Sequence, residues 1–171
     1  MRRTIAAAAV CCALAGLQLA ARQDATKVEL KNAQGQSVGT ATLTEPKGVG
    51  VVITLDVQGL PPGEHAIHIH QVPKCEPPFA TAGPHFNPAG KKHGLENPDG
   101  PHAGDMSNFT VGADGSAHTM ITNGRVTLGP GANSLVANGG TALVIHARAD
   151  DMKTDPAGNA GDRIACGVIA K

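Results

Sequence analysis

Hydrophobic and polar residues alternate in short runs along most of the chain after about residue 26. Residues 27–31 alternate two apolar positions with charges, and residues 49–57 are a β-branched run whose odd positions share one face. Side chains two apart point to the same face of a strand, so both runs are typical of strands. The pattern predicts about eight short strands, at residues 27–31, 37–44, 49–57, 65–70, 109–111, 117–122, 142–146 and 164–169. Short strands separated by turns favour an all-β sandwich or barrel.

Two long stretches, Gln71–Asp105 and Ala147–Asp162, show no strand pattern. Glycine and proline number 22 and 12 of the 171 residues, which favours turns over long helices. Long loops in a compact domain are usually functional, so we expect the functional side chains in these two stretches.

The first residues have the features of an export signal. Arg2 and Arg3 precede an apolar run at residues 5–19, and the small residues Ala20 and Ala21 follow it. This order predicts a signal peptide at residues 1–21, cleaved from a domain at residues 22–171. A membrane anchor is the alternative, but the run is short for a spanning helix. We therefore expect a protein exported to the periplasm or secreted, with no stable membrane insertion after cleavage.

After cleavage, two of the four cysteines remain, Cys75 and Cys166. Two cysteines far apart in an exported chain favour one disulfide, with two buried free thiols as the alternative.

Composition and charge exclude several classes of function. Lysine plus arginine and aspartate plus glutamate number 14 each, which argues against a basic nucleic-acid-binding protein. Three Phe, without Tyr or Trp, make base stacking improbable. The feature that needs an explanation is the presence of eight histidines.

The histidine spacing indicates metal binding. His68 and His70 lie two apart and share a strand face, while His65 is an odd number of positions from His68 and is interpreted as structural. Imidazole-only ligation by His68, His70 and His146 suits copper. Histidine nitrogens together with a carboxylate suit zinc, and His93, His102 and Asp105 offer such a set. His85 lies between the copper and zinc sets in the sequence and could serve both metals through its two ring nitrogens.

Five motifs together resemble the copper/zinc superoxide dismutases, over nearly the whole chain from about Lys27. The motifs are Gly63–His70, Gly83–Pro88, Lys92–Gly94, His102–Asp105 and Gly161–Ile169, and residues 74–79 resemble the bacterial form of the family's disulfide loop. The resemblance implies an eight-stranded Greek-key β-barrel with two long functional loops.

The resemblance also implies a set of site residues. It implies one copper per subunit at His68, His70, His85 and His146, and one zinc per subunit at His85, His93, His102 and Asp105. His85 would be a bridging imidazolate, Cys75 and Cys166 an intrasubunit disulfide, and Arg163 the residue that docks superoxide. Asp150 would tie a copper histidine to a zinc histidine, whereas His118 matches no ligand position.

The implied activity is superoxide dismutation, in which copper is alternately reduced and oxidised and dioxygen and hydrogen peroxide are formed. Zinc would be structural, and His85 would relay a proton. The implied role is protection against superoxide outside the cytoplasm, with superoxide as substrate and no nucleic-acid partner. Whether the chain is a monomer or a homodimer is left open.

Two features qualify the resemblance. The loop at 147–162 is shorter than in animal enzymes and is net negative, which predicts a poor guide for an anion. A non-enzymatic copper- and zinc-binding protein is the main alternative, but it predicts loss of Arg163, His85 or a copper ligand, and all are present.

Gly35–Gly39 also matches the G-x-S-x-G hydrolase pattern, but it lies between two hairpin strands rather than at a strand–helix turn, so we interpret it as a chance match.

Overall fold

The computed structural model describes residues 25–171. The predicted signal peptide at residues 1–21, with Cys11 and Cys12, lies outside the described residues. The strands of the described part are β1 (Thr26–Asn32), β2 (Ser37–Thr44), β3 (Val51–Val57), β4 (Gly63–His65), β5 (Ile67–His70), β6 (Phe109–Val111), β7 (Ala117–Asn123), β8 (Thr141–His146) and β9 (Arg163–Ile169). Two short 3-10 turns, η1 (Ala80–Ala82) and η2 (Ala137–Gly139), are the helical elements of this part. No helix of the described residues is long and apolar enough to cross a membrane.

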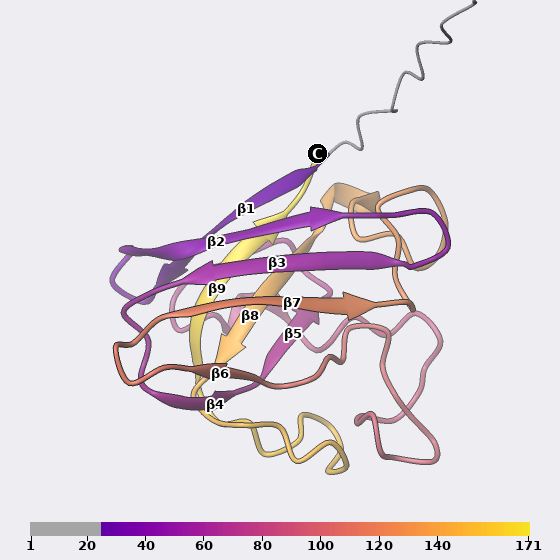
Figure 1. Ribbon diagram of the computed structural model, residues 1–171. Helices are drawn as coiled ribbons and strands as arrows, with labels where there is room; N and C mark the ends of the chain where they lie inside the picture. The colour runs from indigo at the N-terminus through magenta and orange to yellow at the C-terminus, as the bar shows by residue number, and fades with distance from the viewer. Residues whose placement is uncertain (1–24) are drawn as a thin grey trace, which may run out of the picture.

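Seven strands form one antiparallel sheet in the order β5-β8-β9-β1-β2-β3-β7, and β4 pairs with β6 in a second, small sheet. The large sheet curls, so that β2, β3 and β7 cross in front of β5, β8 and β9 (Figure 1). The alternating positions of β3 face inward, and Val51, Ile53 and Leu55 have no exposed surface. The predicted all-β fold is confirmed, and the core lies between the two halves of the curled sheet.

The region predicted as one strand at residues 65–70 is two strands. His65 pairs with Phe109 of β6, whereas Ile67 pairs with Ile145 of β8. The chain changes partner at Ala66, whose N–H donates to the carbonyl of Arg148, 2.9 Å away. Sequence periodicity does not show this change of partner, because both short strands keep the extended backbone.

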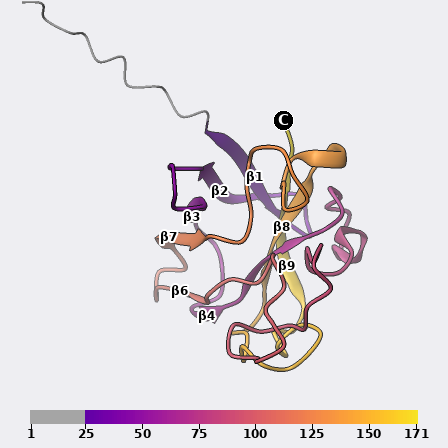
Figure 2. The same cartoon turned by 90° about the vertical axis from the view of Figure 1, so that its right-hand side faces the viewer.

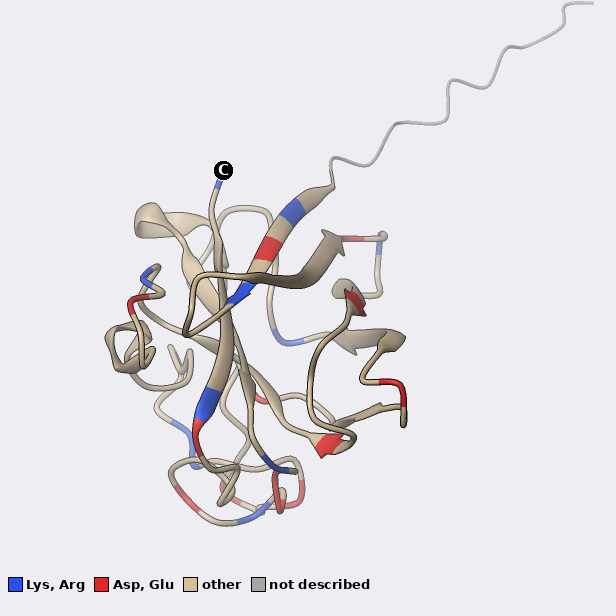
Figure 3. Ribbon diagram, turned by 90° about the vertical axis from the view of Figure 1, so that its left-hand side faces the viewer, with Lys and Arg blue, Asp and Glu red and all other residues tan. Residues whose placement is uncertain are grey.

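The two predicted long loops contain no strand of the described structure, and η1 is the one helical turn within them. They lie at the same end of the molecule in Figures 1 and 2. Both signs of charge are interspersed on these loops (Figure 3). A third long connection, residues 124–140, was not predicted to be a loop of this size. Glu45 secures it by accepting hydrogen bonds from Thr127 Oγ1 and the Leu128 N–H, at 2.6 and 2.7 Å.

Cys75 and Cys166 form a disulfide across 91 residues, so the alternative of two free thiols is wrong. This bond ties the start of the first loop to β9. Phe79, Ala82, Ala142 and Val144 pack around it in a small cluster apart from the main core.

Candidate metal centre

Four histidines from three regions of the chain meet beneath the long loops. His68 and His70 lie on β5, His146 ends the neighbouring strand β8, and His85 lies beside His70 in the first loop. One ring nitrogen from each lies within 4.8 Å of the others. All four side chains are buried. The outward face of β5 is therefore covered, which explains why every residue of this strand is buried despite its alternating pattern.

Hydrogen bonds fix which nitrogen of each ring carries the proton. His70 Nδ1 donates to the carbonyl of Gly83 at 2.8 Å, and His146 Nδ1 donates to the carbonyl of Gly161 at 3.3 Å. The Nε2 atoms of these two neutral rings therefore present lone pairs, and they lie 3.4 Å apart. Two lone pairs at that distance repel each other unless a cation lies with them.

Burial keeps these rings neutral. Loss of solvation, helped by the neighbouring rings, lowers the pKa of His70 to about 2, of His146 to about 3 and of His85 to about 4. Neutral imidazole is the form that binds a metal ion, so His70 and His146 need release no proton at neutral pH, whereas His85 must lose its one N–H proton to bind through both nitrogens.

The second group of ligands is centred on one carboxylate oxygen. Asp105 Oδ1 lies 2.8 Å from His85 Nδ1, 3.1 Å from His93 Nδ1 and 3.3 Å from His102 Nδ1. The other oxygen, Oδ2, accepts the backbone N–H groups of Gly94 and His102 at 2.9 Å each. The carboxylate is therefore fixed by the backbone while three ring nitrogens converge on its free side.

The second group contains charged side chains, whereas His70, His85 and His146 of the first group are neutral. Burial raises the pKa of Asp105, but hydrogen bonds from His85 and His93 outweigh burial and hold it well below its usual range. Burial lowers the pKa of His93, but hydrogen bonds from both ring nitrogens to Asp105 and Asp150, and the charges of these carboxylates, raise the pKa to about 9. His93 is therefore protonated at neutral pH when no metal is bound.

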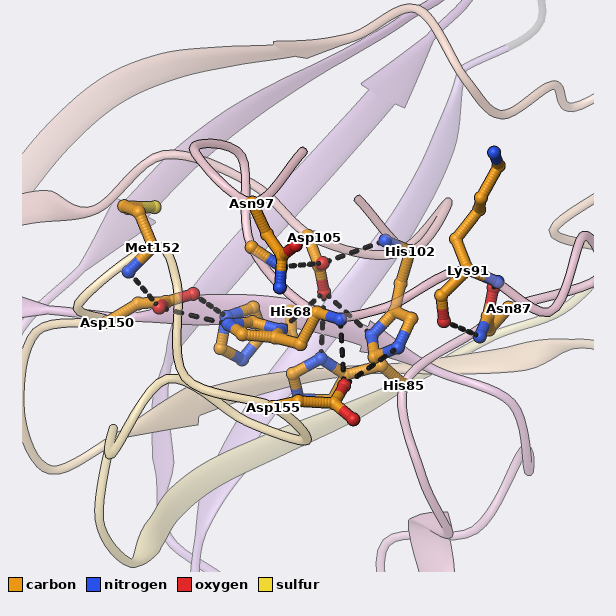
Figure 4. Close-up of polar contacts among 12 residues, drawn as sticks. His68, His85, Asn87, Lys91, Asn97, His102, Asp105, Asp150, Met152 and Asp155 are labelled. Atoms are coloured by element: carbon orange, nitrogen blue, oxygen red, sulfur yellow. Dashed lines mark hydrogen bonds and ion pairs between the residues drawn. The ribbon is translucent and has the colours of Figure 1, made fainter. Parts of the chain in front are cut away.

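Asp150 connects the two groups. Its Oδ2 accepts a hydrogen bond from His68 Nε2 at 2.8 Å (Figure 4), and its Oδ1 accepts one from His93 Nε2 at 3.0 Å. Asn108 holds the Asp150 backbone with reciprocal hydrogen bonds of 2.9 Å. A Cβ at Gly158 would lie 1.8 Å from Asp150 Oδ1, so only glycine fits against the carboxylate there.

Arg163 stands at the edge of a cleft that His85, His146 and Lys91 also line. Its guanidinium donates to the carbonyls of Phe79 and Gly83 at 2.7 and 2.8 Å. Both carbonyls belong to the loop that the disulfide anchors to β9. Arg163 therefore presents a fixed positive charge beside the first histidine group.

The structure places two further histidines outside the groups that could hold a metal ion. His65 is buried, and its ring lies 2.8 Å from the carbonyl of His146 and 2.7 Å from that of Pro61. This structural position agrees with the prediction. His118 is exposed on β7.

Most of the acidic residues in the loop at 147–162 are engaged by neighbouring groups. Asp150 bonds histidines, and Asp151 accepts the N–H groups of Lys153 and Thr154. Asp155 accepts the His93 N–H and pairs with Lys92. Lysines from the first loop also line the cleft, so its charge is more balanced than the sequence of one loop indicates.

The residues fit copper and zinc. In the described part of the chain, three buried ring nitrogens have no hydrogen-bond partner: His68 Nδ1, His85 Nε2 and His102 Nδ1. Each points into one of the two groups, and leaving such a nitrogen unbonded is costly unless a ligand binds there. Imidazole-only donors suit copper, and three imidazoles with one carboxylate suit zinc.

Comparison with known proteins decides the family. Residues 37–169 match the family model described as copper/zinc superoxide dismutase. The chain belongs to this family. The function of the family is superoxide dismutation, so the chain is an oxidoreductase with superoxide as its substrate.

Similar proteins include two from Aquifex aeolicus named superoxide dismutase [Cu-Zn] 2 and 1. They are 56% and 49% identical, over 82% and 94% of this chain and 84% and 96% of their own lengths. A crystal structure of a double mutant of a SOD-like protein from Bacillus subtilis has a TM-score of 0.82 and 39% identity. The similarity extends over 85% of this chain and 97% of the Bacillus subtilis chain.

Sequence reasoning about the superoxide dismutase site missed three supporting residues. These residues are Asn108, Asp155 and Gly158, and none of them was predicted to belong to the site. Their roles depend on contacts between two loops distant in sequence, and the sequence carries no local signal for such contacts.

Proposed function

We propose that the chain dismutates superoxide at the cleft between its two long loops. Copper would be held by His68, His70, His85 and His146, and zinc by His85, His93, His102 and Asp105. The observation that carries this proposal is the pair of ligand groups that share His85, with Arg163 lining the same cleft as His85 and His146. Copper, when bound, supplies the one-electron oxidation and reduction that convert superoxide to dioxygen and hydrogen peroxide.

The protein's own groups would bind the anion and move a proton. Arg163 is held by two carbonyls and keeps its charge, so it attracts superoxide to one place at the cleft. His85 reaches both ligand groups through its two nitrogens and would hold and release a proton at Nε2. Asp150 would keep the rings of His68 and His93 in position, which is how carboxylates commonly orient metal ligands.

We further propose that the protein works outside the cytoplasm, in the periplasm or after secretion, where it removes superoxide. The disulfide between Cys75 and Cys166 supports this location, because such bonds persist in oxidising compartments. The order of charged, apolar and small residues at positions 1–21 supports cleavage of a signal peptide.

The first experiment is a direct measurement of superoxide decay with the purified protein after reconstitution with copper and zinc. We expect rapid decay that disappears when copper is omitted. Decay that persists without copper would contradict the copper assignment.

Absence of decay despite bound copper would favour the alternative, a non-enzymatic metal-binding protein. One relative named superoxide dismutase-like protein, from Bacillus subtilis, is 39% identical over 83% of this chain, so this outcome must be measured directly.

A further inference from the structure

Asp155 reaches the zinc ligand group from the opposite loop. Its Oδ1 accepts the backbone N–H of His93 at 2.8 Å and lies 4.0 Å from His102 Nε2. Its Oδ2 lies 3.1 Å from Lys92 Nζ. Figure 4 shows the carboxylate beside His85 and His102, below the group centred on Asp105. One side chain of the loop at 147–162 thus lies against Lys92, His93 and His102 of the first loop.

The Asp155 carboxylate lies on the side of the His102 ring where metal-binding histidines commonly have a carboxylate partner. His102 Nδ1 faces Asp105, so Nε2 is the nitrogen that faces away from the ligand group. A histidine that binds a metal commonly donates its second N–H to a carboxylate, which fixes the ring and makes it a better ligand. Asp150 bonds this nitrogen of His93 at 3.0 Å, and Asp155 faces the corresponding nitrogen of His102 at 4.0 Å, an ion-pair distance rather than a hydrogen bond.

One ion pair between the same two loops contacts no candidate ligand. Lys153 and Glu96 form an ion pair of 3.0 Å across the same loops, and both side chains are largely exposed. Such an exposed pair contributes little to stability. The Asp155 contacts differ because two of them end on residues of the zinc group.

We propose that Asp155 is a positioning residue for the zinc ligands: it binds the backbone N–H of His93 and orients the His102 ring through its charge. This inference rests on the proposed zinc ligand set. It extends that set with a carboxylate that makes no hydrogen bond or ion pair with His68, His70 or His146. Loss of Asp155 therefore weakens zinc binding selectively and leaves the copper group intact.

The test measures zinc and copper affinity of the metal-depleted protein, with its disulfide intact, by competition with chromophoric chelators. Asp155→Ala should lower zinc affinity by about 10- to 100-fold, the usual effect of removing a carboxylate behind a ligand. Asp155→Asn, which keeps an oxygen for the His93 N–H, should lose less. Copper affinity should stay within about twofold in both variants.

Glu96→Gln is the matched control, because it removes an ion pair between the same loops without contacting a ligand. Its zinc affinity should equal that of the unmodified protein. A second readout is the visible spectrum of Co²⁺ bound in place of zinc, which should change in Asp155→Ala because His102 is no longer fixed. The unfolding temperature of the metal-free variants shows whether they remain folded.

Unchanged zinc affinity in Asp155→Ala would overturn the inference, as would an equal loss in Glu96→Gln or an equal loss of copper. Failure of the unmodified protein to bind zinc would instead overturn the ligand set itself, and the Asp155 inference with it. The two failures are therefore distinguishable.

Discussion

At the residue scale, four of the buried imidazoles of the centre are oriented by hydrogen-bond acceptors. Backbone carbonyls serve His70 and His146, and carboxylates serve His68 and His93. These acceptors lie on loops, whereas His68, His70 and His146 lie on strands. The strands therefore give the rings their places, and the loops give them their orientation.

The ligand assignment predicts a selective effect of His146→Ala. His146 belongs to the first group and makes no contact with Asp105, so its loss should lower copper affinity by more than about 100-fold and abolish activity. Zinc binding should persist, because all four members of the second group remain. Metal content after dialysis against both ions measures this. Equal loss of both metals would show that the division into two groups is wrong.

At the element scale, the disulfide and Arg163 act on the same loop. Cys75 and Cys166 join this loop to β9, and Arg163 at the start of β9 donates to two of the loop's carbonyls. The carbonyl of Gly83, which is one of these two, also accepts a hydrogen bond from His70 Nδ1. The loop therefore positions the anion-binding charge and a ligand of the first group together.

Reduction of this disulfide should lower both stability and activity. The bond closes a loop across 91 residues, and its removal should cost roughly 3–5 kcal/mol in the free energy of unfolding. Activity should fall because Arg163 loses its fixed acceptors. Denaturant unfolding and superoxide decay, with and without reductant and at equal copper content, provide the measurement. Unchanged stability and activity after verified reduction would contradict the prediction.

The sequence alone predicts elements better than their partners. Alternation at residues 51–57 identifies β3 because one face of that strand is buried in the core. It cannot show that residues 65–70 divide at Ala66, since the division reflects two different neighbours, β6 and β8. The histidine groups were predictable from their residue types and spacing. Asp155 and Gly158 were not, because their importance arises only where two loops meet.

At the scale of the whole molecule, the centre contains a concentration of polar groups inside a β-sheet protein. His68, His70, His93 and Asp105 have no exposed surface. Burial of such groups is costly without partners, so the metal-free protein should be sensitive to the protonation of its own ligands.

The metal-free protein should lose stability on both sides of about pH 6.5. His70, His85 and His146 have pKa values of about 2, 4 and 3 in the fold against 6.5 when unfolded, so the unfolded chain binds more protons as the pH falls from 6.5 to 4. Stability should drop there by on the order of a few kcal/mol. His93, with a pKa of about 9, has the opposite sign, and its contribution is lost as the pH rises through 9.

Thermal unfolding in the presence of a chelator between pH 4.5 and 9.5 measures this dependence. His70→Gln removes one of the groups that lose stability in acid, so its unfolding temperature should fall less steeply between pH 6.5 and 4.5. His118→Gln is the control, because His118 is exposed on β7 and its replacement should leave the slope unchanged. An unfolding temperature that stays constant from pH 7 to pH 4.5 would mean that the buried histidines accept protons as readily in the fold as in the unfolded chain. In that case burial would not keep the three rings neutral, and they would become protonated in the fold below about pH 6.5, as they do in the unfolded chain.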